Sequence, residues 1–451
     1  MSTTDLAALA AELKARGVRA LTVTWCDANG IQRSRSAPID KLASAVERGM
    51  GCSFLFAVFD THDHIAWGVE GVDTPTGDFR VKAVPERIVQ LAGQPAFAWA
   101  PGQLWLQEGP RWEHCYRAAL ERTVERAAGL GYEFKAGLEL EWFIGEDSDE
   151  PKAAHHGPVY SPNAMLDVSE FVSELLADLD ANGLGIGQIH AEYGWSQVEI
   201  SLDAADPLTA ADNQLLARET IRDASRSNGL RSSFAPLITP DGVGNGWHFH
   251  VSILKDGVNL LSGGDGPEGM TPEGEAFVAG ILRDLPGVVA VTAPSVPSLI
   301  RLRPGYFASA YAFWGADNRE ASLRFVPGAE AIGVQNANIE LKASDASCNP
   351  YLGLTAMIAC GLGGIEDGLK LPESISEDPG GWTPDQRQTA GVRRFAQNVE
   401  EQIANFENAP RIRAAFGDPL ANAFVGVRRS DEAWADGKSA DEIIGVHLWR
   451  Y

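Results

Sequence analysis

The sequence predicts an α+β protein with two domains, and three observations support this interpretation. The chain has 451 residues, more than the roughly 100–200 residues of a usual single domain. Strand-like and helical patterns alternate along most of the chain, and several of the predicted strands carry polar side chains on one face. Apolar residues make up 45% and charged residues 22% of the chain, the balance of an ordinary globular protein.

Residues 1–102 are expected to form the smaller domain. Apolar residues at helical spacing predict an amphipathic helix over residues 4–16. The β-branched run at residues 20–25, followed by the turn sequence at 27–30, predicts a hairpin. The Ala-Pro-Gly segment at 100–102 is a plausible boundary, because a long helical pattern follows it.

Residues 103–451 are expected to form the larger domain, in which strands and helices alternate. The predicted helices cover residues 111–130, 169–182, 210–228, 274–285 and 350–369. The predicted strands cover residues 132–144, 197–202, 247–254, 321–325 and 335–342. Segments rich in Gly, Pro or acidic residues at 262–267 and 373–386 predict surface loops.

Composition narrows the class of protein. The net charge of −24 argues against nucleic acid as a partner, because a duplex binder needs a cationic face. The five cysteines are scattered without a CxxC pair, which favours reduced thiols. The sequence shows neither a signal peptide nor about 18 consecutive apolar residues that could span a membrane. A cytoplasmic protein without membrane partners is therefore expected.

Paired charges on predicted strands are the first sign of chemistry. Glu139 and Glu141 are two residues apart, so their carboxylates share one strand face and repel each other unless a cation lies between them. A solvated strand face would explain this pair equally well. Glu199 lies in an apolar run, where an unpaired charge would be costly to bury. The sequence also places His248 and His250 on one strand face behind a Gly-rich loop.

Carboxylates and histidines on separate strands, without thiolates, suit hard divalent cations such as Mg²⁺ or Mn²⁺. Zinc would more often recruit cysteine or a helical HExxH, and the sequence has neither arrangement. Arg301, Arg319 and Arg324 are candidate phosphate-binding residues. No P-loop is present, so metals and arginines would have to hold a nucleotide.

These motifs, in this order, resemble the glutamine synthetase family over nearly the whole chain. The resemblance implies a small N-terminal β-grasp domain and a large catalytic domain with an antiparallel sheet flanked by helices. It also implies ATP and two or more Mg²⁺ or Mn²⁺ ions. The implied ligands of the first metal are Glu141, Glu192 and Glu199, and those of the second are Glu139, His248 and Glu340.

The same resemblance assigns the remaining site residues. Positions near the nucleotide are His250, Ser252 and Arg324. The catalytic arginines are Arg301, Arg319 and Arg324, of which the first grips the α-carboxylate and the other two neutralise the transferred phosphate. Substrate-binding positions are Gly244, His248, Arg301, Phe307 and Lys342. The implied reaction phosphorylates the γ-carboxylate of glutamate, and an amine then attacks the acyl phosphate.

Two departures from the family concern the amine. Ammonia-using members place a Glu in the flap that follows Pro-Gly, whereas this chain has Phe307. They also place an Asp in the small domain, whereas residues 49–54 contain no carboxylate. An ammonium ion needs acceptors and a group that takes its proton. The sequence therefore predicts a γ-glutamylamide synthetase for an apolar alkyl or aryl amine, with Trp195 and Trp247 among the aromatic residues that could enclose it.

Other departures concern the acid. Lys342 stands where the family usually has an Arg, and Val243 stands at an Asn position of the glutamate pocket. Glutamate is the expected acid, with a related acid as an alternative. A true glutamine synthetase that uses ammonia and a non-catalytic structural or sensing protein are the other readings. Family members usually form double-ring dodecamers, so a ring-shaped homo-oligomer is expected.

Overall fold

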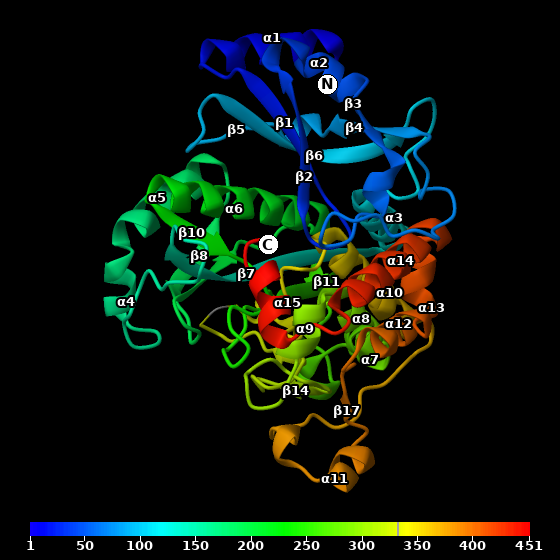
Figure 1. Cartoon of the computed structure of the whole chain (residues 1–451). Coiled ribbons are helices and arrows are strands. Elements are labelled where there is room, and N and C mark those ends of the chain that lie inside the picture. Colours follow the sequence, from blue (N-terminus) through cyan, green and yellow to red (C-terminus); the bar gives the residue numbers. More distant parts are fainter. Residues whose placement is uncertain (332) are drawn as a thin grey trace.

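The computed structural model describes residues 1–331 and 333–451. A small sheet with two helices, formed by the N-terminal part of the chain, lies above a large sheet that is flanked by helices (Figure 1). The C-terminal helices lie beside the large sheet (Figure 1). A short helical segment, labelled α11, projects at the end of the molecule farthest from the small sheet (Figure 1). The predicted α+β class is confirmed.

The small sheet contains six strands in the order β2-β1-β6-β4-β3, with β5 paired to β6. The hairpin predicted near the N-terminus is the antiparallel pair β1 and β2, and β1 also pairs with β6 in parallel. The elements are α1 (Thr3–Ala15), β1 (Ala20–Cys26), β2 (Gln32–Pro38), α2 (Leu42–Glu47), β3 (Met50–Ser53), β4 (Asp78–Ala83), β5 (Val89–Gln90) and β6 (Phe97–Leu106).

The large sheet contains nine strands in the order β14-β15-β16-β11-β7-β9-β8, with β10 on β7 and β12 on β11. Its pairs are antiparallel except β14 with β15. The strands are β7 (Tyr132–Glu146), β8 (Ile186–Ala191), β9 (Gln197–Leu202), β10 (Leu230–Ser233), β11 (Phe249–Lys255), β12 (Val258–Asn259), β14 (Trp314–Ala316), β15 (Leu323–Val326) and β16 (Asn338–Leu341). A separate short pair joins β13 (Tyr311–Ala312) to β17 (Arg393–Arg394).

Helices cover the large sheet and form the C-terminal part. They are α3 (Tyr116–Gly129), α4 (Pro162–Asp167), α5 (Ser169–Ala181), α6 (Pro207–Ser227), α7 (Pro272–Arg283), α8 (Leu285–Thr292), α9 (Val296–Arg301), α10 (Pro350–Glu366), α11 (Pro384–Thr389), α12 (Val399–Glu407), α13 (Pro410–Phe416), α14 (Asp418–Ala435) and α15 (Ala440–His447). Both α3 and α6 pack against β7, the longest strand. Because side chains alternate along a strand, Leu138 and Leu140 are buried on one face while Glu139 and Glu141 occupy the other.

Several predicted boundaries are wrong. The helix expected from residue 111 begins at Tyr116, because Arg111 instead bridges to Trp105 in β6. The strand expected from residue 335 begins at Asn338, after a 3-10 turn, and the strand expected from residue 247 begins at Phe249. The expected loop at 373–386 contains a 3-10 turn and the start of α11.

The turn between β1 and β2 connects the small sheet to the part of the chain that precedes α10. Gly30 has φ +71°, and a Cβ there would lie 2.6 Å from the Ala346 carbonyl oxygen. Asn349 caps α10 and donates its side-chain N–H to the Cys26 and Asp27 carbonyls at 2.9 and 3.0 Å. The strand β6 extends past residue 102, so we propose that the division between the domains follows Leu106.

Two further sequence-based expectations concern cysteines and membranes. All five cysteines are buried, and none is in a disulfide. Outside position 332, no helix combines the length and the apolar character needed to cross a membrane.

Candidate active site

Several of the predicted site residues are cross-strand neighbours on one face of the large sheet. Glu141 on β7 lies opposite Glu199 on β9. On the other side of β7, His250 on β11 lies opposite Glu340 on β16, which in turn lies opposite Arg324 on β15. Because residues directly opposite each other project from the same face, strand register alone brings these side chains together.

Glu139, His248 and Glu340 form a compact group, here called the histidine triad. One ligand atom from each lies within 4.8 Å of the others, and within the described residues no other group of this kind is as compact. His248 Nδ1 is 2.9 Å from Glu139 Oε2 and 3.3 Å from Glu340 Oε1. These residues are the predicted ligands of the second metal, and their spacing suits one divalent cation.

Cationic side chains surround the histidine triad. Arg324 donates to Glu340 Oε2 at 3.1 Å, and Lys342 Nζ is 3.3 Å from Oε1 of the same carboxylate. Burial opposes ionisation of Glu340, yet Lys342 and the neighbouring imidazoles lower its pKa to about 2. Burial also opposes ionisation of Glu139, but hydrogen bonds and charge from the two histidines lower its pKa. Both carboxylates are therefore in the anionic form that binds metals.

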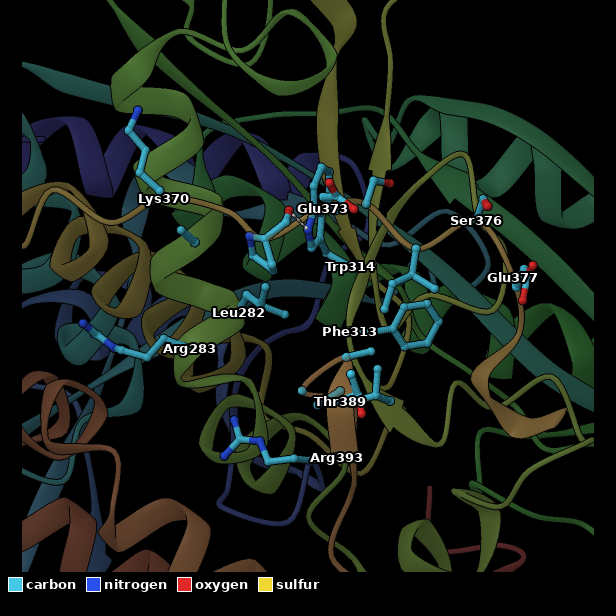
Figure 2. Close-up of a pocket in the computed structure, with 18 of the residues that line it drawn as sticks. Leu282, Arg283, Phe313, Trp314, Lys370, Glu373, Ser376, Glu377, Thr389 and Arg393 are labelled. Carbon is cyan, nitrogen blue, oxygen red and sulfur yellow. Dashed lines mark hydrogen bonds between the residues drawn. The ribbon is translucent and has the colours of Figure 1, made fainter. Parts of the chain in front are cut away.

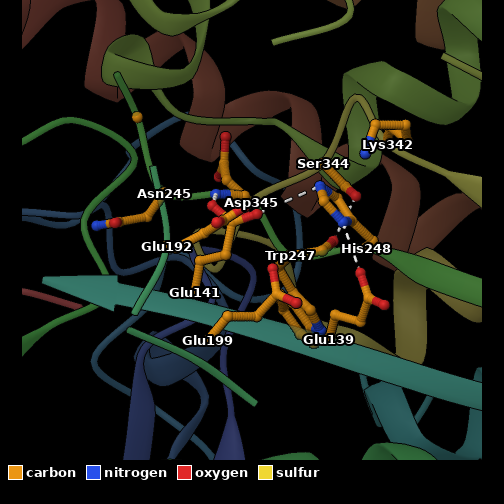
Figure 3. A network of polar contacts seen from close by, with 12 residues as sticks. Glu139, Glu141, Glu192, Glu199, Asn245, Trp247, His248, Lys342, Ser344 and Asp345 are labelled. Atoms are coloured by element: carbon orange, nitrogen blue, oxygen red, sulfur yellow. Dashed lines mark hydrogen bonds and ion pairs between the residues drawn. The ribbon is translucent and has the colours of Figure 1, made fainter. Parts of the chain in front are cut away.

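Glu141, Glu192 and Glu199 form a second group, here called the carboxylate triad. Figure 3 shows the three side chains close together beside His248. Burial and repulsion from Glu141 raise the pKa of Glu192. Burial likewise raises the pKa of Glu199; His190 partly offsets this, and the neighbouring glutamates reinforce it. Glu192 Oε2 is buried and has no hydrogen-bond partner in the described part of the chain. Three acidic groups with too little positive charge fit a divalent cation.

The carboxylate of Glu141 is oriented by two donors. The Gln197 side chain and the Gly246 backbone N–H donate to Glu141 Oε2 at 2.8 and 2.7 Å. A Cβ at Gly246 would lie 2.8 Å from His248 Nε2 and 3.0 Å from Glu141 Oε1, so this position has no room for a side chain. Gln197 was missed in the sequence, although its spacing of two from Glu199 on β9 places both on one face.

A cavity of about 280 Å³ borders the carboxylate triad. The predicted substrate-binding and catalytic residues that line it are Gly244, His248, Arg301, Phe307, Arg319 and Lys342. Arg324, His250 and Ser252 do not line this cavity. Farther along the sheet, His250 Nδ1 lies 2.9 Å from Asn338 Oδ1, and the Ser252 hydroxyl donates to the Ala337 carbonyl at 2.9 Å.

Arg301 is buried at the wall of this cavity. It donates to the Ser344 carbonyl at 2.9 Å and lies 3.3 Å from Asp345 Oδ2. A Cβ at Gly244 would lie 2.6 Å from Arg301 Cγ, so only glycine lets the loop pass over this arginine. Arg319, in contrast, is exposed and has no ion-pair partner among residues 1–331 and 333–451. Arg319 is therefore free to meet an anionic substrate.

Aromatic residues form one side of the cavity. The rings of Tyr193 and Phe307 meet edge-on with centroids 4.9 Å apart, although 46% and 59% of these residues are exposed. Phe307 has φ +55°, in the left-handed region. Tyr160 also lines the cavity and donates its hydroxyl to Glu192 Oε1 at 2.8 Å. The flap residue Phe307 thus borders the cavity.

The two tryptophans expected near the amine do not line this cavity. Trp247 is fully buried and stacks on Phe249, while Trp195 packs against Phe143. Neither is among the described residues that line the cavity. Tyr160 and Tyr193 take this place, and no strand or loop pattern in the sequence distinguishes them from surface tyrosines.

No residue of either triad lines a second, larger cavity of about 830 Å³. Its walls come from the end of α7, the strand β14 and the segment 369–393, with Phe313, Trp314 and Arg393 among the lining residues (Figure 2). None of the predicted site residues lines it.

The two triads and the cationic cavity are typical of enzymes that bind divalent cations together with anionic substrates. The catalytic-domain family described as "Glutamine synthetase, catalytic domain" matches residues 113–441. The chain belongs to the glutamine synthetase family.

Individual relatives support the same family assignment. The chain is 40% identical over 448 residues to a gamma-glutamylpolyamine synthetase, GlnA3, of Streptomyces coelicolor, covering 98% of this chain and 96% of the relative. It is 29% identical over 432 residues to a glutamine synthetase of Halobacterium salinarum, covering 94% and 92%. A crystal structure described as a novel glutamine synthase homolog superposes with a TM-score of 0.85 at 28% identity, covering 96% of this chain and 99% of that chain. The sequence-based assignment to the family and the prediction of a glutamate–amine ligase are confirmed.

Proposed function

We propose that this enzyme joins the γ-carboxylate of glutamate to an organic amine, with ATP as the energy source. The observation that carries the choice of amine is the Tyr193–Phe307 ring pair beside the carboxylate triad, at the flap where ammonia-using relatives place a Glu. Aromatic rings bind alkyl chains and the faces of cations, but cannot take a proton from ammonium. The 40% identical relative is named for a polyamine substrate, which also favours an organic amine.

We propose that the carboxylate triad and the histidine triad each hold one Mg²⁺ or Mn²⁺ ion. The support is the unpaired oxygen of Glu192, the raised pKa values of Glu192 and Glu199, and the compact grouping of Glu139, His248 and Glu340. Such ions neutralise the charges of carboxylate and phosphate groups when bound.

The residues of this chain support a two-step reaction. In the first step, a γ-carboxylate oxygen of glutamate attacks the γ-phosphorus of ATP, and ADP leaves with γ-glutamyl phosphate formed. Arg301 would hold the α-carboxylate, while Arg319 and Arg324 would neutralise the transferred phosphoryl group. His250 and Ser252 lie farther along β11, where they would meet the nucleotide.

In the second step, the neutral amine nitrogen attacks the γ-carbon, phosphate leaves with one former carboxylate oxygen, and the proton that the nitrogen loses goes to the departing phosphate. Glu192 and Glu141 line the cavity in which this nitrogen would arrive. The acid is expected to be glutamate, and Lys342 would meet its carboxylate as a point charge without a bidentate fork.

An amine panel tests this proposal. Purified enzyme with ATP, glutamate and Mg²⁺ is given ammonia, alkylamines, arylamines and diamines at equal concentrations, and γ-glutamyl products are measured by mass spectrometry. Organic amines should exceed ammonia at least tenfold in kcat/KM. Equal or better use of ammonia would establish a true glutamine synthetase, and no product with any amine would favour a non-catalytic role.

We also propose that the protein is a cytoplasmic homo-oligomer. Relatives with this fold typically form rings, and a double-ring dodecamer is the expected form. ATP and glutamate are abundant cytoplasmic metabolites, which supports this location.

A further inference from the structure

Glu320 lines the cavity that borders the carboxylate triad. The reaction described above gives this residue no role. It lies between β14 and β15, directly after Arg319. Its backbone N–H donates to Asn318 Oδ1 at 2.9 Å, which fixes the turn. In the part of the chain that the structure describes, its carboxylate has neither a hydrogen-bond nor an ion-pair partner.

The electrostatic surroundings of Glu320 leave it short of positive charge. Partial burial raises its pKa, and repulsion from Asp378 adds to this effect, while Lys342 partly offsets it. Lys342 is already engaged, because its Nζ lies 3.3 Å from Glu340 Oε1. A cationic group that entered the cavity would therefore gain from contact with Glu320.

The walls beside Glu320 suit an alkyl chain that carries charge. Tyr193, Tyr306 and Phe307 line the same cavity. Arg303 lies over the Tyr306 ring at 3.6 Å and donates to the Gly242 carbonyl at 3.2 Å, so the base of the flap is held in place. The exposed rings of Tyr193 and Phe307 offer apolar surface for methylene groups and π-faces for an ammonium.

We propose that Glu320 determines amine specificity by binding the second, non-reacting ammonium group of a diamine or longer polyamine. This inference rests on the proposed function. One nitrogen would reach the γ-carbon beside the carboxylate triad and lose a proton, and the other would stay protonated at Glu320. The exposed faces of the Tyr193 and Phe307 rings would contact the carbon chain. The apolar amine expected from Phe307 alone becomes an amine with an apolar chain and a charged far end.

A matched pair of substrates tests the role of Glu320. 1,4-Diaminobutane and butylamine share the same chain and differ in the second amino group. Wild-type enzyme should prefer the diamine at least tenfold in kcat/KM, measured by ADP release and confirmed by mass spectrometry of the product. Glu320→Gln removes the charge while keeping the shape, and should lower this preference at least tenfold. Glu320→Asp should retain part of it.

Control variants separate specificity from general damage. Glu373→Gln removes one exposed carboxylate outside the cavity and should keep the wild-type preference. Thermal melting checks that each variant is folded. Calorimetric titration of 1,4-diaminobutane into wild-type and Glu320→Gln enzyme gives a readout that needs no turnover, and the variant should bind at least tenfold more weakly.

The contradicting outcomes are distinct. Equal use of the two amines by wild-type enzyme, or an unchanged preference and unchanged diamine binding in Glu320→Gln, would overturn the role of Glu320 while leaving an amine ligase intact. Equal losses for both amines would also overturn it, because they indicate a general defect. Absence of any γ-glutamyl product with every amine would instead overturn the proposed function, and calorimetry would still decide whether Glu320 binds the diamine.

Discussion

Glu139 and Glu141 stand two residues apart on β7, yet strand pairing gives them different surroundings. Glu139 meets two imidazoles, at 2.9 Å from His248 and 3.5 Å from His250. Glu141 is held by amide donors and lies opposite another acid, Glu199. The histidine triad is thus balanced by positive charge, whereas the carboxylate triad has an excess of negative charge. This contrast predicts different effects when a carboxylate is neutralised.

Replacing Glu192 with Gln should raise the stability of the metal-free protein and reduce the stabilisation that a metal ion provides. Without metal, the variant should melt at a higher temperature than wild type, because a partly buried carboxylate that Glu141 repels has lost its charge. With Mn²⁺, its gain in melting temperature should be smaller, because the stabilisation by a bound ligand increases with the affinity for that ligand. Differential scanning fluorimetry across a Mn²⁺ titration measures both effects.

Glu373→Gln is the matched control for Glu192→Gln, since it removes an exposed charge outside the site. It should keep the wild-type response to Mn²⁺. An equal response of Glu192→Gln and wild type would show that Glu192 binds no metal.

His114 should contribute to acid sensitivity. Burial lowers the pKa of its ring to about 4 from an ordinary value of 6.5. Between these pH values the unfolded chain binds more protons than the folded chain, so stability is lost as the pH falls below 6.5. His114→Phe should reduce the slope of unfolding free energy against pH in this window by up to about 1.4 kcal/mol per pH unit.

Denaturant unfolding at several pH values between 4 and 6.5 measures this slope. His156→Phe is the control, because this ring is exposed in the folded protein and meets water in both states. An unchanged slope in His114→Phe would mean that the buried ring is not neutral.

The sequence was more informative about the acidic residues of the two triads than about the walls of the cavity. Acidic residues two positions apart on a strand, or single acidic residues in an apolar run, would be costly to bury without a partner. Residues such as Glu199 can therefore be recognised from the sequence. Tyr160, Tyr193 and Glu320 carry no such signal. They lie in loops, and their position at the cavity depends on contacts between distant segments that no local spacing encodes.

At the scale of elements, strand and helix patterns were most informative where burial is one-sided. The strand β9 has the predicted bounds, and β7 extends two residues beyond them. Tertiary contacts decided the errors. Arg111 bridges to the small sheet, so α3 begins later in the chain than predicted. The strands β8 and β10 were not predicted, and each pairs with a strand of the large sheet. The helices α12 to α15 were not predicted individually.

The close packing of α7 against α10 should depend on glycine. A Cβ at Gly364 would overlap the Ala276 carbonyl oxygen and lie 2.6 Å from Gly280 Cα. Gly364→Ala should therefore lower the free energy of unfolding by about 1–3 kcal/mol, the usual cost of overpacking a core. Gly129→Ala, at the end of α3 and in open space, is the control and should be neutral or stabilising by up to about 1 kcal/mol.

Chemical denaturation of both variants measures these changes. A Gly364→Ala protein as stable as Gly129→Ala would show that α7 and α10 can separate without cost.

At the scale of the whole molecule, the large sheet carries the site residues, and the small sheet is fixed beside it. The Gly30 turn and the Asn349 side chain join the two parts through buried contacts. A monomer and a ring would differ in how much of the small sheet is covered by neighbouring chains. Light scattering after size exclusion should give a mass many times that of one chain. A monomeric mass with full activity would contradict the proposed ring.

The central claim is that glutamate is activated as γ-glutamyl phosphate and captured by an organic amine. Glutamate labelled with ¹⁸O in its γ-carboxylate tests this most directly. With ATP, Mg²⁺ and 1,4-diaminobutane, each γ-glutamyl amide should be accompanied by one phosphate that carries one ¹⁸O, and ammonia at the same concentration should give at least tenfold less labelled phosphate. Product formed with unlabelled phosphate, or equal labelling with ammonia, would contradict the account.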